Sequence, residues 1–424
     1  MTDKKNTIPF KRFSMHEDWM VVVVGFFIIL LSIVGLDIPV PSFSWRNSEE
    51  LFKLVLSREN LWRVLLQFLF VFGIAILATF LINKSVTNAL RTYPLLFGLT
   101  LIALILSGNH QVRALNLESV IFSLAIGLTV SNVFTLPDWM RDSLSAEMFV
   151  KIGLVLLGTT IIFSDILIAG GLGLIQALLV VLSVWYFAFW ICKKLKIDEE
   201  LTMMISSAVS ICGVSAAIAT AGAIKGDTKK LSYVISLVLI TAIPMMIFMP
   251  YIARYFHFPD EVTGAWLGGS IDTTGAVVAS GTLVGDTALK VSTIVKFSQN
   301  VLLGLAAFAI SVYWTYSGRV DKEGKVSKPT ARLIWERFPK FVIGFVLASL
   351  VFSFILDPDI VESVKGSLKS IQGMWFVLAF TSIGLETKFS DLFNEDNKKP
   401  LYGFLIAQTF NVLVTLIIAY FLFG

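Results

Sequence analysis

Long apolar runs recur along the whole chain and limit its fold more than any other feature. A helix needs ~20 apolar residues to cross the hydrocarbon core of a bilayer. The runs are continuous and lack the ~10-residue alternation of a membrane barrel, so an all-α polytopic membrane protein is predicted. The thirteen runs lie near residues 19–36, 61–83, 92–107, 115–133, 148–164, 171–191, 203–224, 231–251, 263–284, 291–316, 338–356, 370–386 and 401–423.

Composition agrees with a membrane location and excludes several functional classes. Of 424 residues, 56% are apolar and 15% charged, whereas about a quarter of a soluble domain is charged. The net charge of +4 does not suggest a nucleic-acid partner. Cys192 and Cys212 stand far apart in apolar runs, without disulfide or zinc spacing. No phosphate-binding loop, dinucleotide-binding glycine pattern or nucleophile elbow occurs, so no organic cofactor is expected.

The distribution of Lys and Arg predicts orientation, because these residues concentrate in cytoplasmic connections. Segment 1–18 and connection 317–340 are both basic and are therefore expected to be cytoplasmic. The C-terminus then lies outside a bacterial inner membrane. The basic residues concerned are Lys4, Lys5, Lys11, Arg12, Arg319, Lys322, Lys325, Lys328, Arg332, Arg337 and Lys340.

A further basic cluster leaves two topologies open. Lys225, Lys229 and Lys230 fall outside if all thirteen runs cross the membrane. If the runs at 203–224 and 263–284 are re-entrant hairpins, the cluster returns to the inside. The sequence allows either thirteen crossings or eleven crossings with two hairpins.

Two pairs of similar segments predict an internal repeat. Residues 210–228 and 270–287 share an SI start, small-residue spacing and a GDT end, and 156–167 resembles 382–393. In the hairpin topology the first pair enters the membrane from opposite faces, as inverted repeats of transporters do. The order of the four segments is not that of a simple duplication.

The first GDT-ending segment crowds small residues where a lipid-facing helix carries bulky ones. Its candidate site residues are Ser210, Cys212, Gly213 and Ser215. Small residues allow tight helix packing. They also suit unwound backbone around a cavity, where a half-helix N-terminus binds an anion. Both interpretations are open.

The second segment adds an ionisable group, Asp272. A carboxylate within a membrane run costs about 3 kcal/mol, so it is usually paired or functional. It either caps the half-helix that follows or binds an ion such as Na⁺. The candidate residues here are Ser270, Asp272, Thr273, Thr274 and Gly275.

A polar stripe in a later run and one acidic residue complete the candidate site. Lys296 either neutralises Asp272, faces an anionic solute or extends to the interface. Ser298, Gln299 and Asn300 continue the stripe, and Glu386 is either an interfacial or a site residue. These features predict a carrier of a small polar solute instead of an enzyme. An intramembrane hydrolase using Ser and Asp chemistry is the alternative, although no spacing places a base beside a nucleophile.

Four segments resemble the YeiH-type sulfate exporter family. They are SSAVSICGVSAAIAT (206–220), AWLGGSIDTTGAVVASG (265–281), STIVKFSQN (292–300) and SIGLETKFSDL (382–392). LLGTTIIFSDIL (156–167) is also similar to a run in that family. The resemblance covers about 115–423. Segment 1–18 then precedes helices at 19–108, which include a two-helix insertion, and a transporter core at 109–424.

The resemblance implies an elevator-type secondary transporter related to bile-acid symporters and cation–proton antiporters. A core domain with discontinuous helices would move against a panel, in a protein that is a candidate homodimer. The chain departs from the family pattern, with Asp272 at the family's His, Thr273 at its acid and Gln299 at its Arg. The changes weaken the sulfate assignment and favour Na⁺ or H⁺ coupling. The resulting expectation is transport of a small anion, sulfate or sulfonate-like.

Overall fold

A computed structural model describes residues 15–36, 39–114, 118–316, 332–388 and 398–424. Regular structure in these ranges is helical apart from one isolated bridge between Trp45 and Asn109, which confirms the all-α fold. The long helices are α1 (Glu17–Ile33), α3 (Arg58–Leu81), α4 (Val86–Ser107), α6 (Ser119–Val133), α8 (Ala146–Leu157), α9 (Phe163–Lys194), α12 (Thr228–Tyr255), α15 (Asp286–Tyr316), α17 (Lys340–Leu350), α18 (Pro358–Glu386) and α19 (Lys399–Phe423). Short helices are α2 (Ser48–Glu50), η1 (Leu51–Val55), α5 (His110–Ala114), α7 (Asp138–Arg141), η2 (Gly158–Thr160), α16 (Arg332–Arg337) and η4 (Val351–Ile355).

Local sequence signals explain where several of these helices begin. Ser57, Ser85, Asp227 and Asp357 each accept a hydrogen bond from a backbone amide in the first turn of α3, α4, α12 and α18. Such N-caps satisfy amides that have no partner within the helix. Polar caps between apolar runs therefore divide the chain into separate membrane-length helices.

Eight helices are long and apolar enough to cross a membrane within the described residues. α1, α6 and the α17–η4 segment are shorter and run alongside them. We call the side on which α1 begins the near face and the side on which it ends the far face. With these, eleven elements are available to cross, the number that the hairpin topology requires.

The remaining two apolar runs are re-entrant hairpins. The first hairpin comprises α10 (Glu199–Ser207), η3 (Ala208–Cys212) and α11 (Val214–Ile224). Its two ends lie together, because the Asp227 amide donates to Glu200 over 3.1 Å and Lys230 Nζ lies 2.7 Å from Asp198. The first hairpin therefore enters from and returns to the near face.

The second hairpin comprises α13 (Asp260–Ser270) and α14 (Thr274–Val284). Gly264 on α13 and Gly281 on α14 both pack against residues 288–292 of α15, where a Cβ on either glycine would collide. Arg254, at the end of α12, donates to the carbonyl of Leu283. Since α12 crosses the membrane between the hairpins, the second one enters from the far face. Both runs therefore turn back within the structure, as the topology with two hairpins requires.

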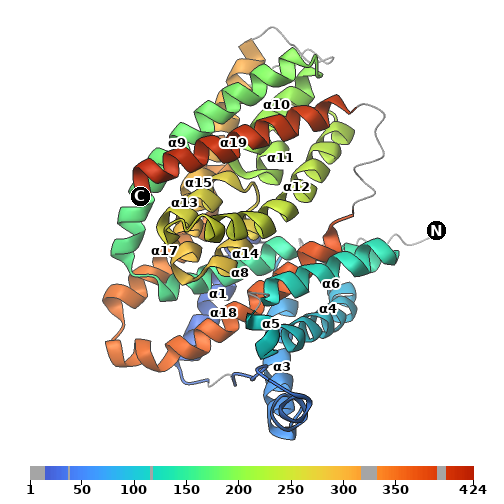
Figure 1. The fold of residues 1–424 in the computed structure, drawn as a ribbon, viewed down its shortest axis with the longest axis vertical. Helices are drawn as coiled ribbons and strands as arrows, with labels where there is room; N and C mark the ends of the chain where they lie inside the picture. The colour runs from blue at the N-terminus through green and yellow to red at the C-terminus, as the bar shows by residue number, and fades with distance from the viewer. Residues whose placement is uncertain (1–14, 37–38, 115–117, 317–331, 389–397) are drawn as a thin grey trace, which may run out of the picture.

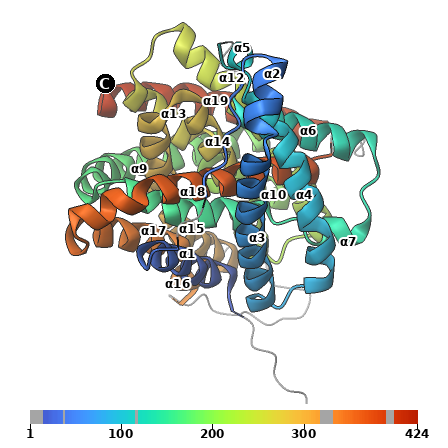
Figure 2. The ribbon, with the colours of Figure 1, turned by 90° about the horizontal axis from the view of Figure 1, so that it is seen from below.

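The helices form two groups (Figure 1). The hairpin bundle consists of α9 to α15 and α19, with α9 and the two hairpins packed around α15 and with α19 packed on α9 and α13. The panel bundle consists of α1, α3, α4, α6, α8, α17 and α18, with α18 packed on both α6 and α8. In Figure 2, α3 and α4 lie side by side at one edge of the panel bundle. These two helices are the predicted insertion.

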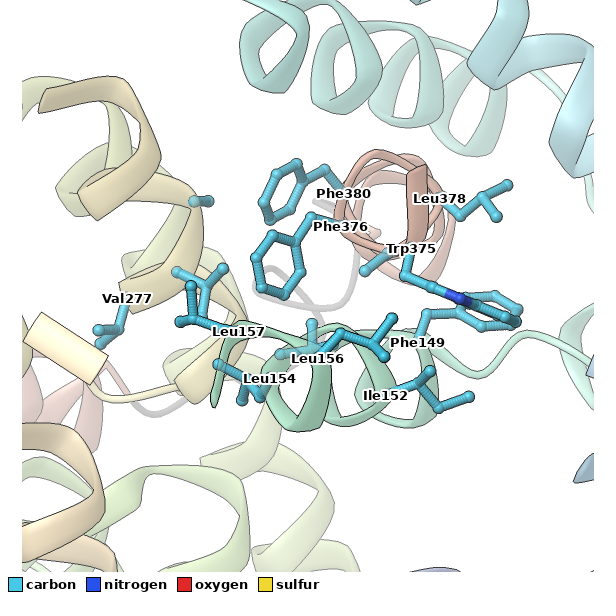
Figure 3. Packing of buried hydrophobic residues seen from close by; sticks show 14 of the residues in the cluster. Phe149, Ile152, Leu154, Leu156, Leu157, Val277, Trp375, Phe376, Leu378 and Phe380 are labelled. Carbon is cyan, nitrogen blue, oxygen red and sulfur yellow. The ribbon is translucent and has the colours of Figure 1, made fainter. Parts of the chain in front are cut away.

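Large apolar side chains hold the panel bundle together. Figure 3 shows Phe149 of α8 beside Trp375 of α18. Trp375 is fully buried, and its ring centroid lies 5.7 Å from that of Phe149. Aromatic burial of this kind gives a rigid surface against which the hairpin bundle rests.

Some sequence predictions lie wholly or partly outside the described residues. These are most of segment 1–18, much of connection 317–340 and the end of 382–393. The basic cluster at 225–230 lies on the near face, beside Asp198 and Glu200. That the near face is cytoplasmic stays a prediction.

Candidate functional site

The tips of the two hairpins meet at one buried cation, Lys296 of α15. Its Nζ donates to the carbonyls of Ile211 and Ile271 and to Oε1 of Gln299, each over 2.8 Å. Ile211 and Ile271 lie where η3 and α13 end, and helix C-termini carry partial negative charge. With its side chain 1% exposed, Lys296 therefore joins the two chain reversals.

Three amide side chains satisfy the other carbonyls at the tips. Gln299 Nε2 donates to the carbonyls of Ser210 (2.8 Å) and Gly269 (3.3 Å). Gln408 Nε2 of α19 donates to the Ser270 carbonyl over 2.9 Å. Asn411 donates to the carbonyls of Val209 (2.9 Å) and Ser270 (3.2 Å). Broken helices are tolerated at membrane depth when their backbone groups are satisfied in this way.

Asp272 lies between the second tip and the first. Its carboxylate is 2% exposed and in contact with Gln408, and one oxygen, Oδ2, has no hydrogen-bond partner. A Cβ on Gly213 would stand 3.1 Å from the Cβ of Asp272. The Ser270 hydroxyl and Oε1 of Gln408 are also buried without a partner. Three oxygen acceptors without a donor thus lie on neighbouring residues.

A cavity of about 500 Å³ separates the tips from the panel bundle and extends to the near face. α11 and α14 both begin at this cavity. The first amides of a helix lack an acceptor within it and form its positive end. Thr273 caps α14 by accepting from the Ala276 amide over 3.3 Å. Asn300 also lines the cavity, donates to Thr274 over 3.3 Å and leaves its Oδ1 unpartnered.

The panel wall of the cavity is charged. Lys151 of α8 lies 2.8 Å from Glu17, 3.0 Å from Asp18 and 3.4 Å from Glu147. Glu386, at the end of α18, accepts from the Ala146 amide (3.0 Å) and the Ser382 hydroxyl (3.2 Å). These groups lie toward the near-face ends of α1, α8 and α18, so the mouth of the cavity is polar.

The structure brings half of the predicted site residues to the cavity. Those lining it are Cys212, Ser215, Thr273, Thr274, Gly275, Asn300 and Glu386. The others lie outside the lining and are Ser210, Gly213, Ser270, Asp272, Lys296, Ser298 and Gln299. Lys296 and Gln299 hold the tips, whereas the Ser298 hydroxyl faces the Gly170 carbonyl of α9.

Sequence reasoning missed Gln408, Asn411 and Lys151. Gln408 and Asn411 are three residues apart on α19 and therefore share one face. Two amides on one face of an apolar run were a readable signal. Lys151 also stands in an apolar run, and its position four residues after Glu147 was a second signal.

Comparison with known proteins places the chain among membrane proteins. A UPF0324 membrane protein of Rhodopirellula baltica is 40% identical over 80% of this chain and 64% of its own length. One of Nitratidesulfovibrio vulgaris is 39% identical over 71% of the chain and 54% of its own length. One of Nitrosomonas europaea is 30% identical over 65% of the chain and 62% of its own length. The chain thus spans between half and two thirds of the length of these relatives.

The search of solved structures gave no match. The family described as "Conserved hypothetical protein 698" matches residues 91–403, which include both hairpins and the panel helices α6, α8, α17 and α18. Because this match covers most of the chain, the protein belongs to this family of UPF0324 membrane proteins.

Proposed function

We propose that the protein is a secondary transporter of a small solute with an anionic group, working by alternating access. The observation that carries this proposal is the meeting of two re-entrant hairpins from opposite faces, with α11 and α14 beginning at one cavity. Helix N-termini at membrane depth bind anionic groups of solutes in transporters with inverted repeats. Asn300, 6% exposed with an unpartnered oxygen at this cavity, supports a bound ligand independently.

The position of the cavity supports an elevator-like movement. It is lined by the hairpin bundle on one side and by the panel bundle on the other, and it extends to the near face. Gly275 packs closely against the panel bundle beside the cavity, since a Cβ there would stand 3.0 Å from Ile383 and 3.4 Å from Val150. Sliding of the hairpin bundle along α8 and α18 would carry the tips toward the far face.

Coupling to Na⁺ or H⁺ is assigned to Asp272. Oδ2 of Asp272, the Ser270 hydroxyl and Oε1 of Gln408 are buried acceptors that lack donors. Oxygen ligands of this type suit Na⁺. A proton bound to Oδ2 of Asp272 would equally satisfy the site, because it could be donated to Oε1 of Gln408. Lys296 is committed to three protein acceptors and therefore positions the tips without contacting the solute.

Sulfate or a sulfonate-like anion is the solute class that the YeiH-type resemblance suggests, carried across a bacterial inner membrane with the near face in the cytoplasm. The enzyme alternative, an intramembrane hydrolase, draws less support. The Ser210 hydroxyl donates to the Ser206 carbonyl over 2.7 Å, the ordinary bond of a helical serine, instead of facing a base.

Reconstituted protein tests the proposal. Proteoliposomes should accumulate labelled anion under a Na⁺ or H⁺ gradient without nucleotide. Asp272→Asn keeps the size of the side chain and an oxygen for Gln408, so the variant should remain folded enough to reconstitute, and it should abolish dependence on the ion gradient. A product formed in detergent without any gradient, and lost in Ser210→Ala, would favour the hydrolase. Unchanged gradient dependence in Asp272→Asn would reduce Asp272 to a structural residue.

A further inference from the structure

The two walls of the cavity differ in charge. Every cavity-lining residue that the described hairpin bundle contributes is uncharged. The charged lining residues come from the panel bundle, from the connection between α3 and α4, and from α16, which packs against α15. Five are acidic and three basic, an excess of two carboxylates. The acidic ones are Glu17, Asp18, Glu147, Glu336 and Glu386, and the basic ones are Lys84, Lys151 and Arg337.

An excess of carboxylates is unexpected around a site for a simple anion. A cleft lined by one sign of charge concentrates ions of the opposite sign and repels those of its own. The cavity volume of about 500 Å³ also lies in the range that holds organic ligands. An inorganic oxyanion would leave most of this volume filled with water.

Glu386 lies within about one helical turn of the anion-binding end along α18, as Glu147 does along α8. Ile383, which contacts Gly275 at the start of α14, precedes Glu386 by three residues on α18. Val150, the other contact of Gly275, lies four residues after Ala146 on α8, and the amide of Ala146 donates to Glu386. Two helices thus independently place Glu386 about one helical turn, ~5 Å, nearer the near face than the α14 N-terminus.

Glu386 is available for a ligand. Its partners are an amide and a hydroxyl, and no ion pair with it is found among the described residues. Lys84, which lines the same cavity, points to the Ser145 hydroxyl over 3.4 Å. Glu17, Asp18 and Glu147, by contrast, share Lys151.

Asn300 adds an acceptor beside the anion-binding end. Its Oδ1 is buried and unpartnered, while its amide group is held by Thr274. A fully ionised oxyanion has no hydrogen to give to this oxygen. A solute with an N–H group next to its anionic group does.

We propose that the solute is a zwitterion, with a carboxylate or sulfonate at the N-termini of α11 and α14 and an ammonium group directed toward Glu386 and Asn300. The inference rests on the proposed function and names its substrate class. A short carbon chain between the two charges matches the separation of one helical turn. The anionic end of the solute then meets the positive helix N-termini, and its ammonium end meets the carboxylates of the panel bundle.

Binding to the purified full-length protein tests this inference. Calorimetric titrations with glycine, β-alanine and 4-aminobutyrate should detect at least one ligand, whereas propionate and sulfate should bind at least tenfold more weakly. Glu386→Gln keeps an oxygen for the Ala146 amide and removes only the charge. The substitution should weaken binding of that zwitterion roughly ten- to hundredfold, which corresponds to the free energy of one hydrogen bond to a charged group. The affinity for propionate should stay unchanged or increase. Glu362→Gln, a carboxylate of the same helix that lies outside the lining, is the matched control and should change affinity less than threefold.

The outcomes separate this inference from the proposed function. Tight binding of sulfate or propionate, without binding of the amino compounds, overturns the zwitterion and leaves an anion transporter. Equal weakening of zwitterion and propionate by Glu386→Gln assigns Glu386 a structural role and also overturns it. If all five compounds fail to bind and none is transported into proteoliposomes, both proposals are wrong.

Discussion

The two hairpins reach the same point in the molecule by different means. The first reverses through its backbone, with a π-helical turn at η3 followed by Gly213 at φ +59°. The second reverses through an extended stretch at 271–273 and is organised by the side chains of Asp272 and Thr273. The first tip is therefore a fixed structural element, whereas the second carries the groups that can respond to an ion.

The largest expected effect is common to both hairpins. Lys296→Met removes the ammonium that satisfies the carbonyls of Ile211 and Ile271 and leaves Asp272 without the nearby cation. Losing one partner of a buried charged group costs about 3–5 kcal/mol of unfolding free energy. Thermal unfolding in detergent measures the loss. Lys290→Met, on the same helix and only partly buried, is the control and should change stability little. If Lys296→Met unfolds at the same midpoint as the wild type, Lys296 does not anchor the two hairpins.

The next effect is specific to the first hairpin. Gly213→Ala places a Cβ in a left-handed conformation and 2.6 Å from Cγ1 of Val238. Strained backbone of this type costs about 1–3 kcal/mol, and the collision adds to it. Gly73→Ala, within α3 and with nothing near its Cβ, should instead stabilise by about 1 kcal/mol. If both alanines behave alike in thermal unfolding, Gly213 is not what fixes the first tip.

A smaller effect is specific to the second hairpin. Thr273→Ala removes the cap that accepts from the Ala276 amide and should cost about 1 kcal/mol. Thr273→Ser keeps the hydroxyl and should retain most of the stability. Hydrogen exchange of residues 274–278 should increase in the alanine variant while residues 214–218 stay unchanged. Equal acceleration in both stretches would mean that the tips open together.

Sequence patterns predict the helices of this fold better than their topology. The apolar runs give the helix positions because membrane length is a strong constraint. A run of about 22 apolar residues has the same pattern whether it crosses the membrane or turns back within it. The topology of runs 203–224 and 263–284 could therefore not be predicted. The reversal depends on the φ of Gly213 and on Lys296 reaching two carbonyls far apart in sequence. Neither is visible in local periodicity.

The candidate site was predictable as a set of segments but not as a cavity. Small residues and Asp272 marked both tips. The panel wall was largely missed, since Lys151 and Glu147 stand in an unremarkable apolar run and Glu386 was only one candidate among many. Which side chains face a shared space depends on the packing of α8 and α18 against the tips. Such long-range packing has no signature in a single sequence.

The smallest expected effect concerns the bases of the hairpins. Asp198 begins the first hairpin and accepts from the amides of Glu200 and Leu201 and from Lys230 Nζ, over 3.1, 3.3 and 2.7 Å. Burial alone would raise the pKa of Asp198, but the hydrogen bond from Lys230, the two amides and the charge of Lys230 outweigh it and lower the pKa. The base of the second hairpin relies instead on Arg254 and a carbonyl, which does not titrate.

A lowered folded-state pKa fixes the direction of the pH dependence. The Asp198 contribution is fully present above the unfolded pKa of about 3.9 and is lost as pH falls through the folded value below it. Asp198→Asn keeps a good N-cap and removes the charge. At pH 7 the unfolding free energy of the wild type should therefore exceed that of the variant by ~0.2–1 kcal/mol, the contribution of an exposed ion pair. Unfolding midpoints should converge as pH falls below about 4. A constant gap for Asp198→Asn at every pH would show that the cap, and not the ion pair, holds the base of the first hairpin.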